Sequence, residues 1–381
     1  MGSIISFLGS IPVPDLNWIG QLVQGLYEWI GSYGWTVVLF TVILKLITLP
    51  IEFWQRCTTK KNAVKMEQMR PMMAKIDKAY GDNKRGAQIE KNKLMKKFGY
   101  SMFSSCLPAI VTLVVFIIMF TGLTSYTSYA IVTEYNDMVD CYHYSVVESA
   151  ANQGLDVPEG LLESGSYEKG YWSEEKENQF TVYFASNIAP LASSDPAKYE
   201  AIIDGSKESV GTFVKENREG FLWVKNIWRP DTWAGVMPTY SEFTKGSLGM
   251  TGVGTAGVNQ AEYEVIYEAV GEYAGGYAGA AWNGLLILPL LAAGLSLLSS
   301  FLSMKTQPAM DPSMQGSGKT LMIIMPLIMV FFVLMYTAAL GVYFVSNSIL
   351  SVISTLALTP IVNKIYSKKD VAIINKASYR R

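Results

Sequence analysis

The stretch TVVLFTVILKLITLP, residues 36–50, is apolar almost throughout, yet it carries Lys45 near its middle. It belongs to the window 34–54, which is long enough to cross a bilayer, because a membrane helix takes about 20 predominantly apolar residues. Of the 381 residues, 50% are apolar and only 17% are charged, whereas about 25% of the residues of a soluble domain are charged. The sequence therefore predicts a membrane protein built from helices.

Four further windows resemble the first in length and polarity. The last of them has several serines and one asparagine in its middle, but it is apolar at both ends, so we count it as a span. The five predicted transmembrane helices are 34–54, 103–123, 284–303, 320–337 and 340–362. The expected fold class is an all-α membrane protein with five transmembrane helices.

Charges are separated sharply between the segments that join these helices. Residues 55–100 carry 13 Lys/Arg against 4 Asp/Glu, and the tail 363–381 carries 6 against 1, whereas residues 124–283 carry 9 against 23. Short cytoplasmic segments of membrane proteins are enriched in Lys and Arg. We therefore expect the basic segments, the short loop 304–319 and the C-terminus in the cytoplasm, and the N-terminus outside.

The segments outside the spans have distinct characters. Residues 1–33 form an outer segment, in which apolar side chains of residues 16–31 fall on one helical stripe. This pattern predicts an amphipathic helix that lies in the outer membrane interface, or one that packs on the protein's own outer domain. The acidic segment 124–283 is long enough to be an inserted extracellular domain, with mixed helical patterning.

The basic segment 55–100 predicts a cytoplasmic helical hairpin. Two helix-forming stretches flank the tripeptide GDN at 81–83, which is typical of a turn. Pro71 lies inside the first stretch and should kink it. Methionines follow one face of the first arm, and they either bind apolar segments of other proteins or pack against the second arm.

No catalytic or metal-binding constellation is visible in the sequence. The cysteines Cys57, Cys106 and Cys141 have neither disulfide nor zinc spacing, and His143 is the single histidine. The stretch 315–320, QGSGKT, resembles a phosphate-binding loop, but that motif requires a preceding strand, and here predicted membrane helices flank it. We therefore expect no enzyme activity, no cofactor and no bound metal.

Lys45 is the most unusual feature of the predicted spans. A lysine at the centre of a membrane helix costs roughly 2.5–3.5 kcal/mol on insertion scales. One interpretation is an ion pair with a buried acid in another span, but the other predicted spans contain no Asp or Glu, and Glu52 lies two turns away, at the cytoplasmic end of the same span. The favoured interpretation is a water-filled groove inside the bilayer, because Thr41, Lys45 and Thr48 follow the spacing of one helical face. Thr41, Lys45 and Thr48 are therefore candidate groove residues.

Four segments, in this order, resemble the YidC/Oxa1/Alb3 family of membrane protein insertases. The first core span of the family is similar to GWTVVLFTVILKLITLPIEFWQ, residues 34–55, and its hairpin and second span to residues 69–110. FLWVKNIWRPD, residues 221–231, looks like the element before the third span. MPLIMVFFVLMYTAALGVYFVSN, residues 325–347, looks like the paired last spans.

The resemblance implies a bacterial plasma-membrane insertase of the Gram-positive-like type. Such a protein moves the polar outer segments of small membrane proteins through a positively charged hydrophilic groove, and releases their helices into lipid. By position, Lys45 stands where the family has the groove arginine, Thr41 and Tyr343 match polar groove positions, and Thr112 stands where the family often has glutamine. The implied partners are nascent membrane proteins, the lipid bilayer, the ribosome through the basic tail and hairpin, and a Sec-type translocon.

Two alternatives from other functional classes stay open at this point. A small-anion transporter would use Lys45 in a substrate site, although such transporters usually have internal repeats, and none is visible here. A scaffold protein would act through its extracellular domain and would leave Lys45 unexplained. The large segment before Phe221 and the lysine in place of arginine depart from the family pattern.

Overall fold

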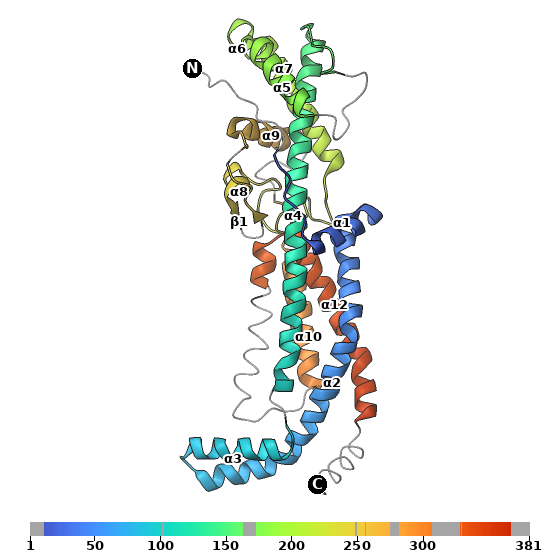
Figure 1. Cartoon of the computed structure of the whole chain (residues 1–381), viewed down its shortest axis with the longest axis vertical. Helices are drawn as coiled ribbons and strands as arrows, with labels where there is room; N and C mark the ends of the chain where they lie inside the picture. The colour runs from blue at the N-terminus through green and yellow to red at the C-terminus, as the bar shows by residue number, and fades with distance from the viewer. Residues whose placement is uncertain are drawn as a thin grey trace. The chain divides into compact units, whose positions relative to one another are not determined.

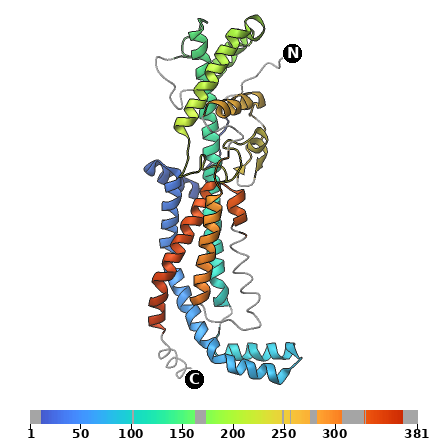
Figure 2. The same ribbon diagram turned by 180° about the vertical axis from the view of Figure 1, so that it is seen from behind.

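The computed structural model describes residues 11–100, 103–162, 173–247, 250–255, 257–274, 282–306, 328 and 330–366. Their regular secondary structure is helical, apart from one pair of two-residue strands. The chain divides into two compact units: unit 1 comprises 1–37, 120–288 and 333–341, and unit 2 comprises 38–119, 289–332 and 342–381. The ribbon is shown from two sides in Figures 1 and 2.

Three helices of the described residues are long and apolar enough to cross a membrane. They are α2 (Tyr33–Tyr80), the part Leu113–Asn152 of α4 (Phe103–Asn152), and α12 (Ala338–Ile365). Helix α10 (Ile287–Thr306) is also apolar, but its apolar part Ile287–Leu302 is shorter. Half of the fourth predicted span, 320–337, lies outside the described residues. The described residues therefore contain three candidate spans, whereas the sequence predicts five over the whole chain.

Two elements that the sequence analysis predicts as separate form one continuous helix, α2, in the structure. It contains both the predicted span 34–54 and the first arm of the hairpin up to Tyr80, and it continues through Pro50 and Pro71. A proline removes one backbone hydrogen bond, but neighbouring contacts can keep the chain helical on both sides. Figure 1 shows α2 changing direction before it runs beside α3.

The hairpin of α2 and α3 (Lys84–Lys97) has its own methionine-rich core. The turn falls at residues 81–83, where the Asn83 side chain accepts a hydrogen bond from the Gly86 amide. The buried core consists of Met66, Met69, Met73 and Met95, with Leu94, Phe98 and Tyr100 packed against it. Of the two interpretations of the methionine face, the structure supports the one in which the two arms pack against each other.

Unit 1 is built around the C-terminal part of α4, from Phe120 onward. The remaining elements of this unit are α1 (Trp18–Ile30), α5 (Glu174–Tyr183), a π-helical turn (Phe184–Ile188), α6 (Leu191–Ser194), α7 (Pro196–Asn217), α8 (Tyr240–Lys245) and α9 (Gln260–Tyr273). The strands β1 (Gly246–Ser247) and β2 (Met250–Thr251) pair antiparallel, with Gly246 opposite Thr251. Helix α9 packs along α7.

The amphipathic segment forms α1, as the sequence predicts, and one side of it packs on α4. Ile19 and Val23 are buried, and a Cβ atom at Gly122 of α4 would lie only 2.3 Å from Ile19 Cγ2. On other positions of the helix, Trp18 and Trp29 are 67% and 77% exposed. Packing on the protein's own chain therefore accounts for one side of α1, and the exposed tryptophans leave the other side available to an interface.

Candidate functional site

Lys45 is paired in the structure. Its Nζ atom lies 2.5 Å from Oε1 of Glu52 and donates a second hydrogen bond to Oγ of Ser351 at 2.9 Å. The side chains of Lys45 and Glu52 are 11% and 23% exposed. The expectation from the sequence that Lys45 has no acidic partner is therefore wrong, because Glu52, two turns along the same helix, pairs with it.

The geometry of the helix explains why the pair forms across seven residues. A rise of 1.5 Å per residue separates the two positions by about 10 Å along the axis, and seven residues make nearly two full turns, so both lie on one face. Lysine and glutamate side chains are long enough to span that distance when they extend toward each other. This one contact pairs the two opposite charges with each other.

Helix α12 supplies the hydroxyl groups around this ion pair. Ser351 accepts from Lys45, Ser354 donates to Oε2 of Glu52 at 3.2 Å, and Thr355 accepts from Nη2 of Arg56 at 2.7 Å. Positions 351, 354 and 355 share one face of α12, since residues three and four apart are neighbours on a helix. We call Lys45, Glu52, Arg56, Ser351, Ser354 and Thr355 the polar cluster.

The polar cluster joins two candidate spans within unit 2. Lys45 and Arg56 contribute two positive charges and Glu52 contributes one negative charge, so the polar cluster has a net charge of +1. Of the polar cluster, sequence reasoning named only Lys45 as a site residue and missed Glu52, Arg56, Ser351, Ser354 and Thr355. The serine-rich middle of the segment 340–362 was the sequence feature that could have revealed the residues of α12. It was interpreted only as a more polar transmembrane helix, and not as one wall of a site.

The other predicted groove residues occupy different environments. Thr41 is 1% exposed and Tyr343 is 5% exposed, so both are buried between helices. Thr48 is partly buried, and its hydroxyl donates to the backbone carbonyl of Lys45 at 3.1 Å. Thr112 lies in α4, and its side chain falls outside the described residues. The structure thus brings the hydroxyl of Ser351, from α12, to the ammonium of Lys45.

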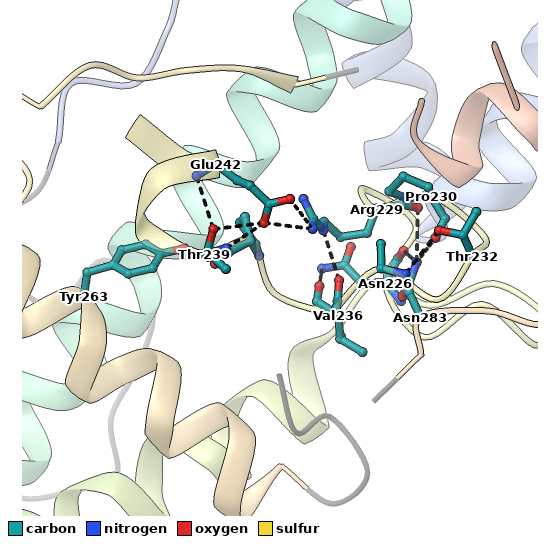
Figure 3. A network of polar contacts seen from close by, with 12 residues as sticks. Asn226, Arg229, Pro230, Thr232, Val236, Thr239, Glu242, Tyr263 and Asn283 are labelled. Carbon is teal, nitrogen blue, oxygen red and sulfur yellow. Dashed lines mark hydrogen bonds and ion pairs between the residues drawn. The ribbon is translucent and has the colours of Figure 1, made fainter. Parts of the chain in front are cut away.

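A second polar network, in unit 1, is built on residues 221–231. Figure 3 shows its members. The Asn283 amide donates to the carbonyls of Asn226, Arg229 and Pro230 at 2.8–3.1 Å, and the Arg229 guanidinium contacts both carboxylate oxygens of Glu242 at 3.1 and 3.2 Å. The network fixes the conformation of a segment that has almost no regular secondary structure.

The segment 221–231 also forms hydrogen bonds with the residues at the starts of helices α10 and α12. The carboxylate of Asp231, which is fully buried, accepts from the amides of Leu285 and Leu288 at 2.7 Å and from Nε1 of Trp223 at 3.0 Å. Backbone carbonyls at 227 and 229 accept from the amides at 339 and 338. A carboxylate that accepts from amides at a helix N-terminus is stabilising. Residues 221–231 therefore anchor the starts of α10 and α12.

Burial alone would raise the pKa of Glu242. Hydrogen bonds from the backbone and side chain of Thr239, together with the charge of Arg229, outweigh that effect and lower the pKa below its ordinary value. Glu242 therefore stays ionised and paired with Arg229 at neutral pH. Among the described residues, no group of three or more His, Cys, Asp or Glu side chains is placed to hold a metal ion.

Comparison with known proteins identifies the family to which this chain belongs. A family model described as "60Kd inner membrane protein" matches residues 25–151 and 197–365, more than half of the chain. The chain belongs to this family, the YidC/Oxa1/Alb3 family. The match includes α2, α12 and residues 221–231, and so both polar networks, whereas residues 152–196, with α5 and α6, fall outside it.

Individual relatives within the YidC/Oxa1/Alb3 family are distant. A membrane protein insertase YidC of Caldanaerobacter subterraneus subsp. tengcongensis is 27% identical over 113 residues, which cover 30% of this chain and 53% of that protein. A membrane protein insertase YidC of Prosthecochloris aestuarii is 27% identical over 133 residues, covering 35% and 21%. The chloroplastic inner membrane protein PPF-1 of Pisum sativum is 29% identical over 103 residues, covering 27% and 22%. The chain thus matches about half, or less, of the length of these relatives.

Proposed function

We propose that this protein is a membrane protein insertase whose polar cluster receives the polar outer segments of its substrates. The observation that carries the proposal is the cluster itself: an ion pair, an arginine and three hydroxyl-bearing side chains meet on two apolar helices. Membership of the YidC/Oxa1/Alb3 family supports the same function. Intramembrane ionisable residues are rare and usually mark a pathway for polar groups.

The proposed mechanism depends on exchange of the partner of Lys45. A carboxylate on an incoming segment takes the place of Glu52 beside Lys45, while Arg56 and the α12 hydroxyls provide further donors. Because the cluster carries more positive than negative charge, it favours an acidic segment over a basic one. Glu52 keeps the ammonium paired when no substrate is present, so that the empty site does not hold an isolated charge in hydrocarbon.

No covalent chemistry or nucleotide is required in this scheme. Polar side chains inside the membrane reduce the distance that a substrate's polar segment must cross in hydrocarbon. The substrate's apolar helix then partitions into lipid, which contributes about 25 cal/mol for each Å² of apolar surface removed from water. The groove residues in this proposal are those of the polar cluster together with Thr41, Thr48, Thr112 and Tyr343.

The proposal includes the membrane arrangement expected from the sequence. Five helices cross a bacterial plasma membrane, with the N-terminus and the segment 124–283 outside and the basic hairpin and tail inside. The substrates are small, nascent membrane proteins. The basic hairpin and tail contact the ribosome, and a Sec-type translocon is a further partner. We also propose that the protein is of the Gram-positive-like type.

Complementation of a bacterium depleted of its own insertase tests the function. We expect the wild-type chain and Lys45→Arg to restore growth and insertion of a substrate with an acidic outer tail, and Lys45→Glu to fail. Glu52→Gln is the matched control, because it keeps both cations of the cluster. Normal insertion by Lys45→Glu would contradict the role of the positive charge. A wild-type chain that accumulates in the membrane but restores no insertion would contradict the function.

A further inference from the structure

Unit 1 contains a cavity of about 420 Å³ that the proposed insertase function does not use. Its walls come from α1, α4, α7 and the segment that follows α7, and α1 and α7 lie beside α4 in both views of the ribbon (Figures 1 and 2). The α4 residues that line it, between Tyr126 and Asp137, recur at spacings of three and four and so form one helical face. Pockets that bind small ligands usually have volumes of about 300–1,000 Å³.

Aromatic rings form one part of the cavity wall. Tyr27, Tyr126, Tyr129 and Trp228 all line it, and Tyr126 lies at the centre, with its ring centroid 6.0 Å from Tyr27, 5.9 Å from Tyr129 and 6.0 Å from Trp228. Behind them Tyr33 is fully buried and stacks on Tyr126 at 5.0 Å. The rings are therefore held in place by packing and do not depend on a ligand for their positions.

Carboxylates form the other part of the wall. Glu28, Glu134, Asp137 and Glu219 line the cavity, and its described lining contains no lysine, arginine or histidine. Glu219 accepts a short hydrogen bond from the Tyr27 hydroxyl. Burial, that bond and the nearby negative charges raise the pKa of Tyr27 above its ordinary value, which agrees with a cavity of negative potential.

We infer that this cavity is a binding site for an organic ammonium group. A cation over the faces of Tyr or Trp rings within about 6 Å is attracted by the ring quadrupole, and recognition of quaternary ammonium groups by several rings is a common use of this interaction. The carboxylates that line the cavity add direct charge attraction. The four acidic side chains of the wall repel an anion.

The aromatic rings in the wall make this site different from an ordinary acidic surface. Surface carboxylates attract any cation weakly, and salt screens that attraction within about 10 Å at 0.1 M ionic strength. Rings recognise a cation by its weakly hydrated methyl or methylene surface, so an organic ammonium ion is favoured over a strongly hydrated Mg²⁺. The site is independent of the polar cluster, which lies in unit 2.

Titration of the purified full-length protein with choline chloride tests the inference. The measurement is saturation-transfer NMR on protein in maltoside micelles, which carry no ammonium group. The neutral isostere 3,3-dimethyl-1-butanol and MgCl₂ at matched ionic strength are the comparison ligands. We expect saturation by choline alone. Equal binding of the neutral isostere, displacement of choline by Mg²⁺ at matched ionic strength, or no choline binding would overturn the inference.

Substitutions in the wall separate the two contributions. Tyr129→Leu should weaken choline binding about 3- to 10-fold, within the range of one cation–π contact, whereas Tyr129→Phe should retain most of it. Glu134→Gln should also weaken binding, and Glu175→Gln, on an exposed position of α5, should leave it unchanged. Retained affinity in both Tyr129→Leu and Glu134→Gln, with circular dichroism unchanged, would place the ligand elsewhere.

The ammonium group can come from a free solute or from a lipid headgroup. Choline binding is therefore compared in nanodiscs of phosphatidylglycerol alone and in nanodiscs that also contain phosphatidylcholine. If headgroups occupy the site, phosphatidylcholine should abolish the binding of free choline, and if the natural ligand is a free solute, binding should persist. Absence of choline binding in pure phosphatidylglycerol nanodiscs would overturn the inference for both sources.

Discussion

The ion pair between Lys45 and Glu52 gives the sharpest quantitative prediction. At an N–O separation of 2.5 Å, the gross Coulomb attraction is about 7 kcal/mol at an effective dielectric constant of about 20, and desolvation of both ions offsets most of it. The two side chains retain 11% and 23% exposure, so the pair falls between a surface pair, worth about 0–1 kcal/mol, and a fully buried one. We expect a net coupling of about 2 kcal/mol.

A double-mutant cycle measures this coupling. Lys45→Met leaves the Glu52 carboxylate without its cation and should destabilise the protein by about 2–4 kcal/mol. Glu52→Gln should cost less, because Lys45 keeps its hydrogen bond to Ser351. The double variant should be more stable than the sum of the single losses predicts. Reversible unfolding in SDS mixed micelles, followed by circular dichroism, gives the four free energies of unfolding.

The exposed pair of Lys93 with Glu90 on α3 is the matched control for the cycle. These side chains are 66% and 36% exposed, far more than those of Lys45 and Glu52, so their cycle should show much smaller coupling, of about 0–1 kcal/mol. Additivity of the Lys45 and Glu52 substitutions within about 0.5 kcal/mol would refute the argument that the two side chains neutralise each other in the folded protein.

Three further predictions concern the parts that hold the helices. Asp231→Asn should destabilise the protein by about 2–4 kcal/mol, because buried amides lose a charged acceptor, and a change in unfolding free energy below about 0.5 kcal/mol would contradict its anchoring role. Met69→Ala should cost about 2–5 kcal/mol by opening a cavity in the hairpin core, whereas Met72→Ala, at a position 40% exposed, should cost little, and equal losses in thermal unfolding would argue against that core. Because the pKa of Glu242 is lowered by folding, its contribution is complete above its ordinary value of 4.5 and is lost as the pH falls below it. Glu242→Gln should therefore flatten the acid limb of the stability curve, and an unchanged limb would contradict the pairing with Arg229.

The helices were largely predictable, because hydropathy windows and turn residues are local properties. The windows around 34–54 and 340–362 lie in α2 and α12, and the GDN tripeptide ends α2 and begins α3. The continuation of α2 through Pro50 into the hairpin was not predictable in this way. Local rules place a boundary near a proline, and tertiary contacts decide whether the helix continues.

The environment of Lys45 was the main error from the sequence. Counting two turns to Glu52 made the acid look distant, although the reach of both side chains closes that gap. The serines of α12 were visible, but their meeting with Lys45 joins positions about 300 residues apart, which one sequence does not reveal.

Unit 1 was the least predictable part of the protein. Its segment 221–231 stands out by resemblance, yet the carboxylate of Asp231 acquires its role only through amides more than fifty residues away. The aromatic cavity likewise combines side chains from α1, α4 and α7. Mixed helical patterning gives each element a weak signal, and tertiary packing alone brings the rings and carboxylates together.

Reconstitution of the purified full-length chain into liposomes tests the central claim most directly. A radiolabelled single-spanning substrate with an acidic outer tail is added, and the fraction protected from external protease is measured. We predict protection well above that of empty liposomes, retention by Lys45→Arg, and loss by Lys45→Glu, with all three variants equally folded by circular dichroism. Protection equal to that of empty liposomes, or undiminished protection by Lys45→Glu, would contradict an insertase that works through the polar cluster.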